Sequence, residues 1–260
     1  MRLSSAAAAQ GSLVLVELDA RQPLPAPDVR WQGRSVALWS EQEGRRYRGL
    51  LPIDLEQAPG AAPLRVRPAG RAECWLGMEV LAGDFPVERL KVAPRFVELS
   101  AENQRRAQRE ARALAAVFAQ VTPERLWSGP FQAPLPGARA SSSFGRRRIL
   151  NGQPRSPHSG VDFGARSGTP VRAPQGGRVA FVESLFFAGR SVVLDHGLGL
   201  YSFFGHLSAT DVRPGQVVAA GDVVGRVGAT GRVTAAHLHW SLRLGEARVN
   251  PLDLLALLGR

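Results

Sequence analysis

Residues 236–240 read Ala-His-Leu-His-Trp, a pattern typical of a β-strand that carries function on one face. Successive side chains of a strand alternate between its two faces, so His237 and His239 point the same way, about 6.5–7 Å apart. Two imidazoles then face one site. That spacing allows one of them to bind a metal ion while the other contacts water or substrate beside it.

A second short pattern, His158-Ser-Gly-Val-Asp162, brings together a histidine and a carboxylate. Pro157, Gly160 and the β-branched Val161 argue against a helix, and in an extended chain residues i and i+4 also share a face. Imidazole nitrogen and carboxylate oxygen both suit zinc, and catalytic zinc sites use three protein ligands and keep a fourth position for water. Each pattern is weak alone, but together they predict a metal site.

The histidines are distributed unevenly along the chain. All five lie in the C-terminal 103 residues, and the first 157 residues contain none. This asymmetry predicts that the chemistry is confined to the C-terminal part of the chain.

The composition sets limits on the class of protein. The net charge of +11 favours anionic partners, which include nucleic acid, anionic lipid or a wall polymer. The arginine clusters are short and no nucleic-acid motif accompanies them, so we expect no nucleic-acid partner. Cys74 is the single cysteine and excludes an intramolecular disulfide. No stretch reaches the roughly 18 apolar residues of a membrane-spanning helix.

The N-terminal half predicts a separate β-domain. Residues 1–11 are small and polar and are interpreted as a disordered tail or the remnant of a signal peptide. Residues 12–98 hold short apolar runs separated by proline- and glycine-containing turns, which favours an immunoglobulin-like β-sandwich. We expect its tryptophans to lie in the core rather than to form a sugar-binding platform: Trp31, Trp39 and Trp75.

Residues 99–129 predict a linking helix and a connector. Ser100 is a plausible N-cap, and an apolar stripe recurs every three or four residues up to Phe118. The opposite face carries arginines and Glu110 and is expected to be solvated. From Gly160 onward β-type runs return with many glycines, which predicts a compact antiparallel β-domain within residues 130–260.

Residues 130–252 closely resemble the lysostaphin-like (LytM-type) zinc metallopeptidases, which cut peptide bonds in bacterial peptidoglycan. The matching stretches extend through this whole region: Ser143-Phe-Gly145, His158-Ser-Gly-Val-Asp162, Gly168-Thr-Pro-Val-Arg-Ala173, Asp195-His-Gly197, Gly205-His-Leu207, Gly225-Arg-Val-Gly228, Thr230-Gly231, Ala236-His-Leu-His-Trp240 and Asn250-Pro251. The resemblance implies the antiparallel peptidase fold of that family, also called the duplicated hybrid motif. The overall class is therefore mainly β.

Carried over position by position, the resemblance assigns one Zn2+ per chain to His158, Asp162 and His239. It leaves His206 and His237 as catalytic histidines. His196 recurs in the family without binding the metal, and we expect it to be structural.

The chain departs from the family pattern at two places near these histidines. Family members commonly have a tyrosine two residues before the position of His206, where this chain has Phe204. A hydroxyl there could assist the reacting centre, so the rate is expected to be affected. The Gly-Pro that often precedes the paired histidines is replaced by Ala235-Ala236.

The resemblance implies a zinc-dependent endopeptidase that hydrolyses peptide bonds in peptidoglycan stem peptides or cross-bridges, in the periplasm or outside the cell. Its partner would be the peptidoglycan peptide, with room for a membrane- or wall-associated partner, and the oligomeric state is not predicted. The alternative is a non-catalytic wall-binding regulator of other hydrolases on the same fold. Such regulators have lost zinc ligands, whereas this chain keeps all of them.

Overall fold

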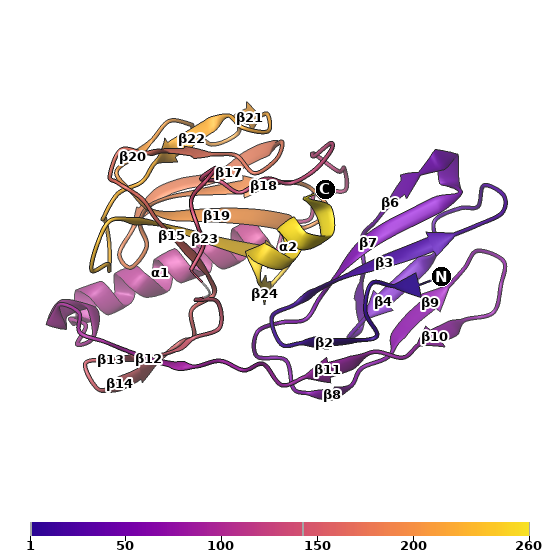
Figure 1. The fold of residues 1–260 in the computed structure, drawn as a ribbon, viewed down its shortest axis with the longest axis horizontal. Helices are drawn as coiled ribbons and strands as arrows, with labels where there is room; N and C mark the ends of the chain where they lie inside the picture. Colours follow the sequence, from indigo (N-terminus) through magenta and orange to yellow (C-terminus); the bar gives the residue numbers. More distant parts are fainter. Residues whose placement is uncertain (1, 142, 260) are drawn as a thin grey trace. The chain divides into compact units, whose positions relative to one another are not determined.

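The computed structural model describes residues 2–141 and 143–259. They form two compact units, one ending at Asp84 and the other beginning at Phe85 (Figure 1). Both units consist mainly of β-strands, and the described residues include two α-helices, so the mainly β class is confirmed. Within these ranges no helix is both long and apolar enough to cross a membrane.

The N-terminal unit is a β-sandwich of short strands. They are β1 (Arg2–Leu3), β2 (Ala7–Ala9), β3 (Leu13–Asp19), β4 (Asp28–Trp31), β5 (Arg34–Ser35), β6 (Leu38–Glu41), β7 (Arg46–Pro52), β8 (Gly60–Ala61), β9 (Leu64–Arg67), β10 (Cys74–Leu76) and β11 (Glu79–Leu81), with the 3-10 turn η1 (Gln42–Gly44) before β7. Two antiparallel four-stranded sheets have the orders β1-β3-β7-β6 and β10-β9-β4-β5. Apolar side chains from both sheets share one core, and the small sheet β2-β11-β8 adds to it.

The first residues of the chain belong to this unit. β1 pairs with β3, and β2 pairs in parallel with β11, with Ala8 opposite Val80. The backbone N–H of Ser4 also donates to the carbonyl of Leu15 at 2.8 Å. Backbone hydrogen bonds hold these strands, and such bonds do not require apolar alternation. The expectation of a disordered tail over residues 1–11 is therefore wrong for the part that the structure describes.

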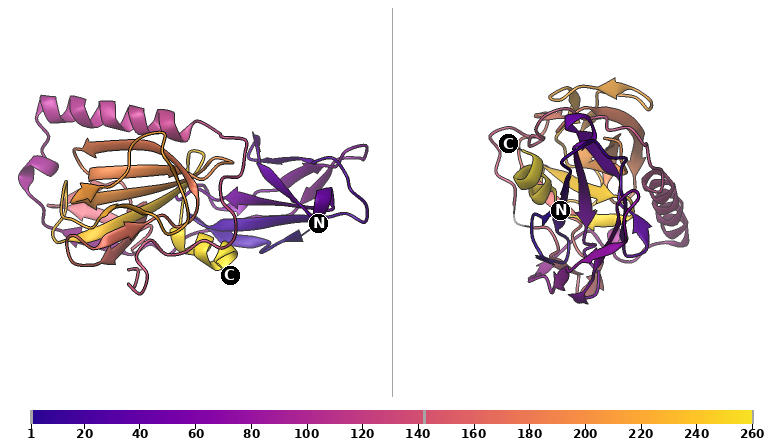
Figure 2. Two further views of the ribbon diagram at one scale, coloured as in Figure 1. Left: turned by 90° about the horizontal axis from the view of Figure 1, so that it is seen from above. Right: turned by 90° about the vertical axis from the view of Figure 1, so that its right-hand side faces the viewer.

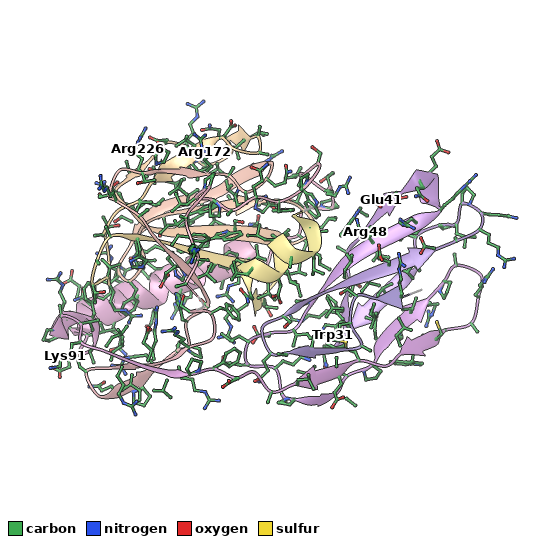
Figure 3. The ribbon with its side chains drawn as sticks, in the orientation of Figure 1. Trp31, Glu41, Arg48, Lys91, Arg172 and Arg226 are labelled. Carbon is green, nitrogen blue, oxygen red and sulfur yellow. The ribbon has the colours of Figure 1, made fainter. Side chains whose placement is uncertain are left out.

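The tryptophans of the sandwich are divided between core and surface. Trp31, on β4 (Figure 3), is 4% exposed, and its indole N–H donates to the carbonyl of Pro52 at 2.8 Å. Trp39 is also buried, whereas Trp75 is 59% exposed. β10, which carries Trp75, is an edge strand of its sheet. The prediction of core positions is right for two of the three and wrong for Trp75.

The C-terminal unit contains both helices and the larger sheet. Its elements are β12 (Val87–Leu90), the 3-10 turn η2 (Pro94–Phe96), α1 (Ala101–Phe118), β13 (Arg147–Leu150), β14 (Gln153–Arg155), β15 (Gly160–Gly164), β16 (Pro170–Arg172), β17 (Gly177–Leu185), β18 (Gly189–Asp195), β19 (Leu200–Leu207), β20 (Ala209–Thr210), β21 (Val217–Val218), β22 (Val223–Arg226), β23 (His237–Leu244), β24 (Ala247–Val249) and α2 (Pro251–Leu258). An antiparallel sheet runs in the order β15-β23-β19-β18-β17-β21, with β24 beside β23. A small sheet, β16-β22-β20, shares its apolar core.

The boundary between the units differs from the prediction. β12 pairs in parallel with β13, with Val87 opposite Arg147, so residues 85–98 belong to the C-terminal unit rather than to the sandwich. The sequence could not indicate this boundary, because β12 looks like one more short strand in a series. Its partner lies 60 residues further along the chain.

Helix α1 is attached to the sheet of the C-terminal unit (Figure 2). Ser100 caps it by accepting a hydrogen bond from the N–H of Asn103 at 3.2 Å, as the sequence predicts. Its apolar stripe packs on side chains of β17, β18 and β19. The face expected to be solvated also contributes, because Arg106 donates to the carbonyl of Ser184 at 2.9 Å and Glu110 accepts from the N–H of Phe186 at 2.7 Å. The helix is thus part of the unit and not a free linker.

The corner between β18 and β19 is built around His196. This side chain is fully buried, and its Nδ1 lies 2.8 Å from the carbonyl oxygen of Gly176. A carbonyl only accepts, so Nδ1 carries the proton and Nε2 accepts from the hydroxyl of Ser202 at 2.9 Å. Burial lowers the pKa of His196 to about 4. Both nitrogens are used within the corner, which supports the structural role predicted for this residue.

Gly197 and Gly215 provide a matched test of this corner. Both have a left-handed backbone, with φ of +84° and +82°. A Cβ at position 197 would lie 1.9 Å from the backbone oxygen of Glu124, whereas one at position 215 would meet nothing within 4 Å. We expect Gly215→Ala to cost about 1–2 kcal/mol from backbone strain alone and Gly197→Ala to cost clearly more. Urea unfolding of both variants checks this, and equal losses would contradict it.

His196 also predicts how stability depends on pH. Its folded pKa of about 4 lies below the ordinary value of 6.5, so its contribution is complete above pH 6.5 and is lost as the pH falls toward 4. The change that this pKa difference makes to the free energy of unfolding amounts to about 3 kcal/mol at most. We expect His196→Gln to be less stable at pH 7.5 but to lose less stability than the wild type between pH 6.5 and 4. Urea unfolding across this range measures it, and parallel curves would exclude the effect.

Candidate functional site

The pairing of β15 with β23 brings the two sequence patterns together. Asp162 lies directly opposite His239 in the antiparallel register, and Val161 lies opposite Trp240. Val161 and Trp240 are fully buried in the core on one face of the sheet. Asp162 and His239 therefore share the other face, as the alternation predicts.

His158 approaches this pair from the segment before β15. Its side chain is 2% exposed, and its Nδ1 lies 2.9 Å from the backbone oxygen of Ser143. Because that oxygen only accepts, Nδ1 is the donor and Nε2 has a free lone pair. Nε2 of His158 lies 2.9 Å from Nδ1 of His239 and 3.2 Å from Oδ1 of Asp162, and the last two atoms are 3.0 Å apart.

This triangle of electron-pair donors fits a small cation. Ligand atoms about 2.0–2.2 Å from a tetrahedral zinc lie roughly 3.3–3.6 Å from one another, so a small outward movement of these three atoms would admit the ion. Burial alone would raise the pKa of Asp162, but the adjacent His158 and His239 lower it far below the usual range. Burial lowers the pKa of His239 to about 4. An ionised carboxylate and uncharged imidazoles are the forms that bind metal.

His237 lies beside this cluster, two residues from His239 on the same strand. Its Nδ1 is 2.8 Å from the backbone oxygen of Ala235 and must donate to it. The lone pair of Nε2 is then free, and this atom is 3.8 Å from Oδ1 of Asp162. The backbone thus fixes the tautomer that presents a base to the site.

His206 reaches the site through an unusual backbone conformation. With simple alternation along β19 it would share the core face of Phe204. Its φ is +64°, in the left-handed region that non-glycine residues rarely adopt. The ring instead lies with its centroid 4.9 Å from that of His237 and 5.9 Å from that of His239.

Neighbouring loops hold His206 in this conformation. Its backbone N–H donates to the carbonyl of Ala188 at 2.7 Å, and its Nδ1 donates to the carbonyl of Thr230 at 2.9 Å. Burial, followed by the nearby His239 and His237, lowers its pKa to about 3. Like His237, it presents an unprotonated Nε2. The supporting role of Thr230 was missed by sequence reasoning, although the pair Thr230-Gly231 was among the family stretches.

Phe204 does not face the histidines. It is fully buried, lies opposite Trp240 in the register of β19 with β23, and belongs to the core of the sheet. The expectation that a side chain at this position contacts the reacting centre is therefore wrong. The spacing of two residues from His206 suggested a shared face, and the left-handed backbone at His206 removes that relation.

Two arginines near the site were not singled out by the sequence. A guanidinium nitrogen of Arg148, on β13, lies 3.9 Å from Oδ2 of Asp162. Arg232 follows Thr230 by two residues and lies over the ring of Phe187, with 4.6 Å between the guanidinium carbon and the ring centroid. In a chain with so many arginines, no local pattern distinguishes these two from the rest.

Comparison with known proteins places this site in a family. The family model described as "Peptidase family M23" matches residues 156–251, which include all five histidines and Asp162. The peptidoglycan DD-endopeptidase ShyA of Vibrio cholerae is 32% identical over 178 residues, covering 67% of this chain and 39% of that protein. The DD-carboxypeptidase/endopeptidase Mpg of Neisseria meningitidis is 38% identical over 121 residues, covering 46% of this chain and 28% of that protein. The chain thus spans less than two fifths of the length of either relative.

A solved structure extends the similarity beyond the peptidase region. A crystal structure described as a peptidase M23 from Pseudomonas aeruginosa is 33% identical, with a TM-score of 0.74, and the match covers 95% of this chain and 94% of that one. Agreement over almost the whole length of both chains, with the family match over the site, shows that this chain belongs to peptidase family M23.

Proposed function

We propose that this chain is a zinc-dependent endopeptidase that hydrolyses peptide bonds in peptidoglycan stem peptides or cross-bridges. The observation that carries the proposal is the triangle of ligand atoms from His158, Asp162 and His239, flanked by two histidines with free Nε2 lone pairs. These three residues would hold one Zn2+ per chain. When bound, zinc supplies Lewis acidity, which polarises a carbonyl group and makes water a usable nucleophile near neutral pH.

We assign the role of general base to His237. Its Nδ1–H is fixed on the carbonyl of Ala235, so Nε2 is the atom that can take a proton. His206 is held in the same way by Thr230, and its ring lies beside that of His237. It would assist His237 by receiving or orienting the same proton. Neither side chain needs to change its backbone contact to act.

The names of the relatives support the substrate class. Both curated relatives are described as endopeptidases, one of them as acting on peptidoglycan. The net charge of +11 suits an anionic wall polymer. A cell-wall substrate would require the protein to act in the periplasm or outside the cell. The regulatory alternative is weakened because the described residues retain a complete set of ligands.

Two single variants separate metal binding from proton transfer. We expect His239→Ala to lose both zinc and cleavage, because it removes a ligand. His237→Ala is expected to keep about one zinc per chain while cleavage falls by roughly 10²–10⁴-fold, the usual contribution of a general base. Metal analysis and release of peptides from purified cross-linked peptidoglycan measure both effects. Chelation should abolish cleavage and added zinc should restore it, whereas unchanged cleavage in both variants would refute the assignment.

Phe204 provides a test of which face of β19 its side chain occupies. Because this side chain lies in the core, Phe204→Tyr places a hydroxyl away from the histidines. We expect kcat/KM to stay within about twofold of the wild type, whereas a hydroxyl acting in proton transfer would contribute roughly 10²-fold or more. Thermal unfolding controls for folding. A tenfold rise in kcat/KM would show that position 204 reaches the reacting centre.

A further inference from the structure

Arg232 is held in place by its backbone and by an aromatic ring. Its N–H donates to the carbonyl of Phe187 at 2.8 Å, and its guanidinium lies over the same residue's ring. Two residues earlier, the carbonyl of Thr230 holds Nδ1 of His206. The segment that orients a catalytic histidine therefore also orients Arg232.

The guanidinium of Arg232 has no acidic partner among residues 2–141 and 143–259. It is half-buried, and its pKa is lowered to about 10, first by burial and then by the positive charges of Arg148 and Arg155. A half-buried cation without an acidic partner is unfavourable unless an anion arrives. Most surface arginines avoid such an arrangement by contacting water or a carboxylate.

The neighbouring acidic residues do not neutralise the positive charge of Arg148, Arg155 and Arg232. Glu88 pairs with Arg148 at 3.5 Å but also pairs with Arg146 at 3.2 Å. Arg155 donates to neutral oxygens, including the carbonyl of Val97 at 2.9 Å. Asp162, 3.9 Å from Arg148, belongs to the metal cluster. An excess of positive charge thus borders the metal cluster on the side of Arg148.

We propose that Arg232, assisted by Arg148, binds a free carboxylate of the substrate peptide close to the scissile bond, so that the enzyme prefers acidic peptides to neutral ones. This inference rests on the proposed function and specifies its substrate class. A guanidinium matches a carboxylate through two parallel N–H···O bonds, which lysine cannot reproduce. A neutral cross-bridge would leave the positive charge of these arginines without a compensating anion.

Two matched substrates test the preference. One is a purified cross-linked peptide dimer with its carboxylates free, and the other is the same dimer with its carboxylates converted to carboxamides. We expect the wild type to show a kcat/KM at least about tenfold higher for the free acid, as a charge-assisted bidentate contact implies. Arg232→Gln should lose most of this ratio by slowing only the acid substrate. Arg232→Lys should give an intermediate ratio.

Arg109→Gln is the matched control, because it removes the same charge from an exposed position on α1. It should leave the ratio unchanged. Arg148→Gln is a second variant should Arg232→Gln fold poorly, and it should reduce the ratio less than Arg232→Gln does. Circular dichroism and thermal unfolding verify that each variant is folded.

Binding separates failure of this inference from failure of the proposed function. The affinities of both dimers are measured calorimetrically on His237→Ala, which does not require turnover. Tighter binding of the free acid that disappears in His237→Ala/Arg232→Gln supports the proposal. Equal affinities, or wild-type cleavage of both dimers at equal rates, would overturn it and leave the peptidase assignment standing. Tighter binding of the acid without any cleavage by the wild type would refute the peptidase assignment instead.

Discussion

The site depends on the register of β15 against β23. This pairing places Asp162 opposite His239 and sends Val161 and Trp240 into the core. A shift of one residue would exchange the faces, burying Asp162 and exposing Trp240. The burial of Val161 and Trp240 opposes such a shift, because a large aromatic side chain loses much favourable burial when it is exposed. The core therefore specifies which face of the sheet carries Asp162 and His239.

His206 obeys a different constraint, because regular alternation would direct it into the core. A left-handed backbone turns the ring toward His237, at a cost of about 1–2 kcal/mol for a non-glycine residue. Close packing of two loops compensates for it. A Cβ at Gly189 would lie 2.2 Å from the hydroxyl of Thr230, and one at Gly231 would lie 2.4 Å from the N–H nitrogen of Gly189. Glycines at these positions let the loops approach until their carbonyls reach His206.

The sequence predicted what strand periodicity and short motifs can encode. The mainly β class, the cap at Ser100 and the shared face of His237 and His239 follow from local rules, and the structure agrees with them. The resemblance alone chose His239 over His237 as the ligand. That choice stays a prediction, although the distances to Asp162, 3.0 Å from His239 and 3.8 Å from His237, are consistent with it.

The sequence could not predict strand pairing between distant segments, or unusual backbone conformations at single residues. Residues 2–9 and β12 join sheets through partners distant in the sequence, and β12 finds its partner across the unit boundary that the sequence suggested. The face of Phe204 was predicted wrongly, because the left-handed backbone at His206 turns that histidine away from the face that the two residues would otherwise share. Arg148 and Arg232 were overlooked because their importance depends on which charges surround them, and only the fold determines that.

Several unfavourable features of the C-terminal unit occur at one place. The lone pairs of His158, Asp162 and His239 converge, His206 has a strained backbone, and Arg232 is half-buried with no acidic partner among the described residues. Each lowers the stability of the free protein. A cation at the triangle would relieve the first feature, and an anion at the arginines would relieve the third. A sheet that needed only to be stable would replace these residues with apolar or paired ones. Their concentration around one cluster is what an active site would require, and the opposite signs of the two unmet charges support the proposal of a substrate whose carboxylate lies beside the bond to be cut.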